Sequence, residues 1–68
     1  MYAVRRLREA RAVFAEDARV DAACPRDAAA RSLLAEPGAE LIVSDGHTIV
    51  RYRVDQIGRI IEQSRYTA

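Results

Sequence analysis

Residues 39–54 read AELIVSDGHTIVRYRV and contain the strongest structural signal in the chain. Two runs rich in β-branched residues flank Asp45-Gly46, a pair that is typical of the tight turn of a β-hairpin. Such a turn requires positive φ angles, which glycine adopts freely and aspartate adopts more easily than most residues. The stretch therefore predicts two antiparallel strands joined at Asp45-Gly46.

The hairpin also predicts which side chains are buried. With a two-residue loop, Ile42 is expected opposite Ile49, and Glu40 opposite Arg51. Side chains alternate between the two faces of a sheet, so one face should collect the apolar residues and form the core. That set is Leu41, Val43, Val50, Tyr52 and Val54.

The N-terminal half favours helices. Residues 3–18 contain no glycine or proline and are rich in Ala, Arg and Glu, which predicts a first helix. Its arginines lie near the start and its acidic residues near the end, the unfavourable order for a helix dipole. The alternative is therefore a short strand at residues 2–7, with the helix after it. A second helix is expected over residues 25–36, with Pro25 in its first turn and Pro37 ending it.

Two structures are possible after Val54. Residues 56–65 could form a C-terminal helix capped by Asp55. Residues 59–65 could instead form a third strand, with Gly58 in the left-handed region of a three-residue loop. The strand is favoured because glycine costs roughly 1 kcal/mol inside a helix and suits the turn. We therefore expect an α+β fold, with two N-terminal helices packed on a small C-terminal antiparallel sheet.

Length and composition set limits on the class of protein. Residues 1–68 are expected to form a single small domain with a small core. The net charge is +1, which gives no global field for nucleic acid or membrane. A single cysteine, Cys24, cannot form an internal disulfide. No apolar run is long enough for a membrane span or signal peptide, so a small cytoplasmic bacterial protein is expected.

The residues that could carry chemistry are few. Cys24 and His47 are the only members of their types, and no flanking signature supports a thiolate–imidazole pair. Asp45, Asp55 and Glu62 could converge as carboxylates, but turns already explain the first two. One cysteine and one histidine at distant positions do not make a metal site. We therefore expect no enzymatic activity, no catalytic residues, no cofactor and no metal.

The second face of the predicted sheet is the candidate site. It combines isoleucines with arginines, and three interpretations compete: burial under the first helix, a protein-binding or homodimer surface, or a nucleic-acid platform. The protein-interaction module is the preferred function, and a nucleic-acid-binding regulator is the alternative. A second basic patch for that alternative is Arg5, Arg6, Arg8 and Arg11. The candidate partner-binding residues are Ile42, His47, Ile49, Arg51, Arg53, Ile61 and Arg65.

Overall fold

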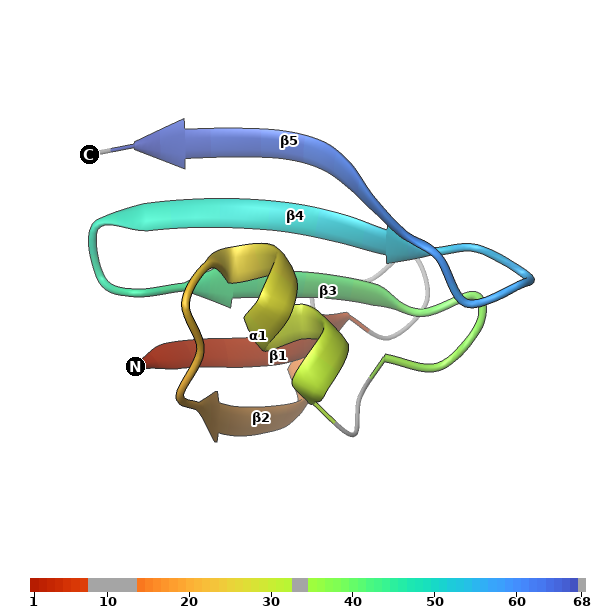
Figure 1. The fold of residues 1–68 in the computed structure, drawn as a ribbon, viewed down its shortest axis with the longest axis horizontal. Helices are drawn as coiled ribbons and strands as arrows, with labels where there is room; N and C mark the ends of the chain where they lie inside the picture. Colours follow the sequence, from red (N-terminus) through yellow and green to blue (C-terminus); the bar gives the residue numbers. More distant parts are fainter. Residues whose placement is uncertain (8–13, 33–34, 68) are drawn as a thin grey trace.

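The computed structural model describes residues 1–7, 14–32 and 35–67. Within them, five strands form one antiparallel sheet in the order β2-β1-β3-β4-β5, and one short helix lies across one side of it (Figure 1). We call the side that carries the helix the inner face and the opposite side the outer face. The elements in chain order are β1 (Tyr2–Leu7), β2 (Phe14–Val20), α1 (Pro25–Arg31), β3 (Glu40–Ser44), β4 (Thr48–Val54) and β5 (Ile60–Thr67).

The N-terminal segment is strand, so the predicted helix over residues 3–18 is wrong, and so is the predicted fold of two N-terminal helices packed on a small C-terminal sheet. β1 and β2 pair antiparallel, and β1 also pairs with β3 in the middle of the sheet. The alternative strand at residues 2–7 is confirmed, whereas residues 8–13 lie outside the described residues. Helix propensity is outweighed by strand pairing, which buries Val4 and leaves Arg5 exposed. The unfavourable charge order for a helix dipole points the same way.

The second predicted helix is present but short. α1 begins at Pro25 as expected and ends at Arg31, five residues before the expected end at residue 36. Ser32 leaves the helical region with φ −73° and ψ 147°, and its hydroxyl donates a hydrogen bond to the carbonyl of Ala29 at 2.9 Å. This side chain competes with the backbone for the last carbonyls and so helps to end the helix.

The register between β3 and β4 differs by two residues from the predicted one. Ile42 lies opposite Arg51 rather than Ile49, and Glu40 lies opposite Arg53 rather than Arg51. A shift of two residues returns every side chain to the same face, so the predicted division into two faces holds. The whole predicted core set is buried: Leu41, Val43, Val50, Tyr52 and Val54.

The turn between β3 and β4 explains the shift. The Asp45 amide donates to the carbonyl of Thr48 at 3.3 Å, so Gly46 and His47 are the two central residues of the turn. Gly46 has φ +89°, and a tight hairpin turn requires a positive φ at its first central position. Asp45 precedes the turn, and its Oδ1 accepts the amides of His47 at 2.8 Å and Thr48 at 2.7 Å.

The third strand of the predicted C-terminal sheet is confirmed, and the alternative helix over residues 56–65 is wrong. β5 pairs with β4 and begins after a turn in which Gly58 has φ +87°. The Asp55 carboxylate closes this turn by accepting the amides of Ile57 at 3.1 Å and Arg59 at 2.7 Å. Glycine and aspartate thus supply the conformation and the acceptor that the turn needs.

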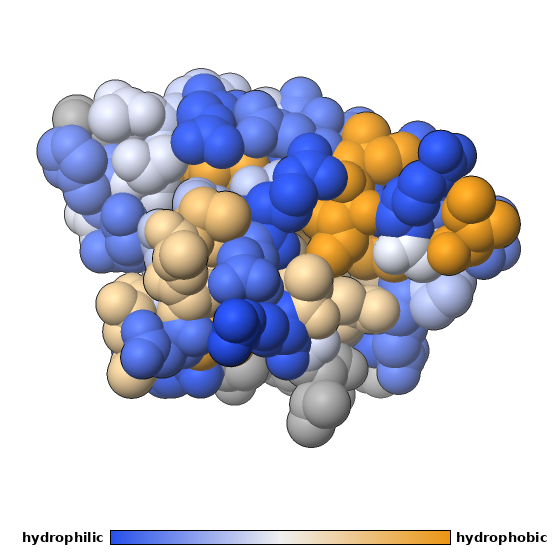
Figure 2. Space-filling view, in the orientation of Figure 1, coloured by the Kyte–Doolittle hydropathy of each residue, from blue (hydrophilic) through white to orange (hydrophobic). Residues whose placement is uncertain are grey.

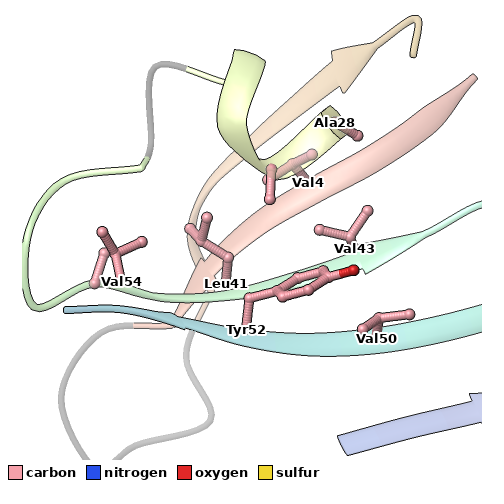
Figure 3. Packing of buried hydrophobic residues seen from close by; sticks show 9 residues of the cluster. Val4, Ala28, Leu41, Val43, Val50, Tyr52 and Val54 are labelled. Atoms are coloured by element: carbon pink, nitrogen blue, oxygen red, sulfur yellow. The ribbon is translucent and has the colours of Figure 1, made fainter. Parts of the chain in front are cut away.

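The core lies between α1 and the inner face. Two alanines of the helix, Ala28 and Ala29, are fully buried, and their small side chains let the helix lie close to the strands (Figure 3). The buried cluster consists of Val4, Ala28, Ala29, Ala39, Leu41, Val43, Val50, Tyr52 and Val54. Burial, and then the nearby Glu62 carboxylate, raise the pKa of Tyr52.

The helix does not cover the whole inner face. Seen from the helix side, apolar atoms gather at the right-hand end of the molecule, near the turn that joins β4 to β5 (Figure 2). Ile57 of that turn is 74% exposed. In the described ranges, no helix is long and apolar enough to cross a membrane.

Candidate functional site

The outer face is the candidate interaction surface, because α1 packs only on the inner face. In Figure 1 the helix lies in front of the sheet, so the outer face points away from the viewer. Register places arginine beside isoleucine across three neighbouring strands: Ile42 of β3 lies between Arg5 of β1 and Arg51 of β4. The same alternation continues at the β4–β5 pair, where Arg53 lies opposite Ile61.

A shallow depression of about 340 Å³ lies on this face. It is lined by Ala3, Arg5, Ile42, Ser44 and Ile49, which come from β1, β3 and β4. Ala3 and Ser44 contribute small side chains to this lining, and Ile42, Ile49 and Arg5 contribute larger ones. The lining is mostly apolar, a chemistry suited to an aliphatic side chain.

The rim of the depression is exposed. Ile49 is 47% exposed, and Tyr66, which lies opposite it on β5, is 70% exposed. An exposed isoleucine or tyrosine alone is ordinary, but here Ile49 and Tyr66 share one sheet face with the half-buried Ile42 and Ile61, and together they form an apolar patch. The described part of the chain provides no element over this patch.

The charges of the outer face are mostly positive. Among the side chains that the structure describes there, arginine occurs at four positions and a carboxylate at Glu40, which forms an ion pair with Arg51; the register also places Asp17 of β2 opposite Arg5. Arg53 lies opposite Glu40 as well. The arginines are Arg5, Arg19, Arg51 and Arg53.

Most of the predicted site residues share this face. Register places Ile42, Ile49, Arg51, Arg53 and Ile61 there together.

Two predicted site residues lie elsewhere. His47 is in the exposed turn between β3 and β4. Arg65 lies on the inner face, opposite Val50. The reason is a β-bulge: Ser64 lies opposite Arg51 and Glu62 opposite Tyr52, so Gln63 has no counterpart and the alternation of faces shifts by one.

Four residues of the site are not among the predicted partner-binding residues: Ala3, Arg5, Ser44 and Tyr66. The preferred helix over residues 3–18 does not place Arg5 opposite Ile42 or Ala3 opposite Ser44. Tyr66 lay beyond the predicted end of the third strand at residue 65. The alternation of Tyr2, Val4 and Arg6 with Ala3 and Arg5 is weak, because only Val4 is strongly apolar.

The predicted basic patch on the first helix does not exist as one surface. Arg5 and Arg6 are neighbours on a strand and therefore point to opposite faces. Arg6 lies opposite Leu41 on the inner face and binds Glu36 at 3.3 Å. Arg8 and Arg11 lie outside the described residues.

The acidic side chains with shifted pKa values serve local structure. Backbone amides of Thr48 and His47 hold the pKa of Asp45 below its ordinary value. The pKa of Asp55 is lowered chiefly by the Arg59 amide, and that of Glu62 by its hydrogen bond with Arg65. Turn closure and ion pairing account for all three shifts.

The other chemistry-bearing residues lie apart from this face. Cys24 is exposed and directly precedes α1, whereas His47 is in the β3–β4 turn. A search of the described side chains finds no group of three or more His, Cys, Asp or Glu residues that could hold a metal ion.

Comparison of the chain with models of protein families, with curated proteins and with solved structures finds no match.

Proposed function

We propose that this protein is a non-enzymatic interaction module that binds a protein partner through the outer face of its sheet. The observation that supports the proposal is the open depression at Ile42 and Ile49, which is bordered by arginines and has no covering layer among the described residues. Aliphatic and aromatic side chains ringed by arginine are typical of protein interfaces.

The size of the face favours a short segment of the partner. Five strands at a spacing of about 4.8 Å, with about six residues each at 3.3 Å, give roughly 400 to 500 Å². Globular partners usually bury about 800 Å² on each side, so this face matches a short peptide segment or a transient contact. Among the described side chains of this face, Arg19 and Arg53 add positive charge beside the Glu40–Arg51 pair, which favours a segment that carries acidic residues beside an aliphatic one.

Nucleic acid is the weaker candidate. Sheets that bind single-stranded RNA generally stack bases on exposed aromatic side chains. On the part of the outer face that the structure describes, Tyr66 at the rim is the aromatic residue, and the centre is aliphatic. Arg51 is already paired with Glu40, which reduces its charge toward phosphate.

A selection experiment tests the proposal. A displayed library of random short peptides is sorted on the immobilised protein, and enriched peptides are then titrated against the purified protein. The test variant is Ile49→Glu, which places a carboxylate at the rim of the depression. The matched control is Gln56→Glu, because residue 56 is exposed in the β4–β5 turn and lies off the outer face.

The expected result is a set of peptides that combine aliphatic and acidic residues. Their affinity should fall at least about tenfold with Ile49→Glu, which desolvates a charge against Ile42 and repels the acidic ligand, and should be unchanged with Gln56→Glu. Enriched peptides without acidic bias, or with equal affinity for both variants, would refute the outer face as the binding surface. A titration with single-stranded RNA at two salt concentrations measures the alternative, because phosphate binding weakens steeply with salt.

A further inference from the structure

The outer edge of the sheet at β5 has a pattern that fits a second copy of itself. β5 is the last strand in the sheet order and has β4 as its one strand neighbour among the described residues. An edge strand presents a row of backbone groups that can pair with another strand. Which residues of β5 point their backbone groups outward follows from the pairing of β4 with its two neighbours.

The hydrogen bonds of Val54 show to which neighbouring strand the backbone groups of each β4 residue point. The Val54 amide donates to Ala39 at 2.9 Å, and its carbonyl accepts the Gly38 amide at 2.8 Å, so Val54 faces the β3 side. Backbone groups of successive strand residues point to alternate sides, so Arg53, Arg51 and Ile49 face β5.

The partners of these three residues on β5 are Ile61, Ser64 and Tyr66. The residues of β5 that direct their backbone groups away from β4 are therefore Ile60, Glu62, Arg65 and Thr67. Arg26 donates to the Ile60 carbonyl at 2.6 Å, which agrees with an Ile60 carbonyl that points away from β4. A carbonyl oxygen has a second lone pair and can still accept another bond.

We propose that two copies of the chain pair antiparallel along β5 and form one continuous ten-stranded sheet. The register places Glu62 opposite Arg65 of the second copy, and Ile60 opposite its Thr67. This is the one antiparallel register in which all four outward-facing residues of one copy meet outward-facing residues of the other. The twofold axis then lies between Gln63 and Ser64.

Side chains agree with the same register. Glu62 lies opposite Tyr52 and Arg65 opposite Val50, so both lie on the inner face and can meet across the edge. On the outer face, Ile61 would lie opposite Tyr66 of the second copy. Each Glu62–Arg65 contact joins opposite charges, and the twofold axis produces it twice.

The β-bulge makes this match possible. In a regular strand, residues 62 and 65 would point to opposite faces and their backbone groups to opposite sides. The extra residue Gln63 brings both onto the inner face and both to the open edge. Bulges and charges often protect an edge from pairing, but here the charges alternate in a self-complementary order.

The dimer would also enlarge the proposed binding surface. The two outer faces would lie on the same side of the ten-stranded sheet, which doubles the area to roughly 800 to 1,000 Å². The dimer proposal does not depend on the peptide-binding proposal, because the edge and the outer face use different groups.

The test is sedimentation velocity over a series of concentrations, with circular dichroism to verify folding. Wild-type protein should double its mass as the concentration rises. Glu62→Arg places two arginines opposite each other at each contact, and Arg65→Glu places two glutamates there. Each single variant should lower the association constant at least about tenfold.

A mixture of the two single variants separates this contact from the intrachain pair. Within one chain, Glu62 and Arg65 already form an ion pair at 2.9 Å, which each single variant loses. Mixing Glu62→Arg with Arg65→Glu restores only the contacts between copies and should restore the dimer. Gln56→Arg, a charge change in the turn, should leave association unchanged.

Amide hydrogen exchange reports the register itself. The amides of Glu62, Arg65 and Thr67 should exchange rapidly in dilute protein and slow at least about tenfold on dimerisation, whereas those of Ile61 and Tyr66 should be protected at both concentrations. A monomer at all concentrations would overturn the proposal. So would a dimer that the single variants do not weaken, or a mixture that stays monomeric.

Discussion

Truncating one residue on each face of the sheet gives the sharpest prediction. Leu41 is fully buried under α1, whereas Ile49 on the outer face is 47% exposed. Leu41→Ala should cost about 3 to 5 kcal/mol, because it loses transfer free energy and leaves a cavity. Burying a whole isoleucine side chain contributes about 1.5 to 3 kcal/mol, so Ile49→Ala should cost about 1 kcal/mol.

Urea denaturation followed by far-ultraviolet circular dichroism measures both values, since the chain has no tryptophan. In melting experiments the Leu41→Ala variant should lose roughly 12 °C or more, at 4 to 8 °C per kcal/mol for a domain of this size. The total stability of a domain of this length is roughly 3 to 10 kcal/mol, so Leu41→Ala could leave it unfolded. In that case the milder variant Leu41→Val is measured instead and compared with Ile49→Val. Leu41→Val should lower the free energy of unfolding by about 1 kcal/mol or slightly more.

Equal losses in the free energy of unfolding for Leu41→Ala and Ile49→Ala would contradict an open outer face. They would mean that Ile49 is buried as deeply as Leu41, and that the sheet has a covering layer on both faces. The proposed interaction surface would then be part of the core.

Three further predictions follow from the turns and the helix end. Gly58→Ala should cost about 1 kcal/mol in urea denaturation, because φ is +87° there although no atom lies within 4 Å of the added methyl group. Because the pKa of Asp55 is lowered mainly by the Arg59 amide, its stabilising effect is present above the unfolded value of about 3.8 and is lost as the pH falls below it. Stability measured from pH 6 downward should therefore fall less steeply in Asp55→Asn than in wild type, and identical pH profiles would contradict this role. Ser32→Ala should cost about 1 kcal/mol through the lost bond to Ala29, and a change below about 0.3 kcal/mol would show that the hydroxyl is not needed there.

The C-terminal sheet could be predicted from sequence because its signals are local. Glycine at the two turns and the period-two burial of Leu41 and Val43 are read within a few residues of each other. The register was wrong by two because Asp45 acts as the hydrogen-bond acceptor before the turn rather than as a central residue. Residue type alone does not distinguish these two roles of aspartate.

The N-terminal strands could not be predicted because their stability is not local. β1 is stabilised by pairing with β3, more than thirty residues away, and Val4 is buried by that pairing. Arginine, alanine and glutamate favour a helix locally, and only the tertiary pairing reverses this preference. Because the helix prediction over residues 3–18 is wrong, it also misplaces Arg5, which lies opposite Ile42 on the outer face.

The bulge in β5 also has no recognisable sequence signal. Gln63 has no distinguishing chemistry, yet it moves Arg65 from the outer face to the inner one. Strand periodicity therefore predicts the sheet face of Ile61 correctly and that of Arg65 incorrectly.

Among the described residues, the sheet is covered by α1 on its inner face and is open on its outer face. Paramagnetic broadening of methyl NMR signals by a soluble gadolinium chelate measures this directly. The methyl signals of Ile42, Ile49 and Ile61 should broaden strongly, while those of Leu41, Val43 and Val50 remain sharp. Equal protection of the isoleucine methyls would contradict an open outer face.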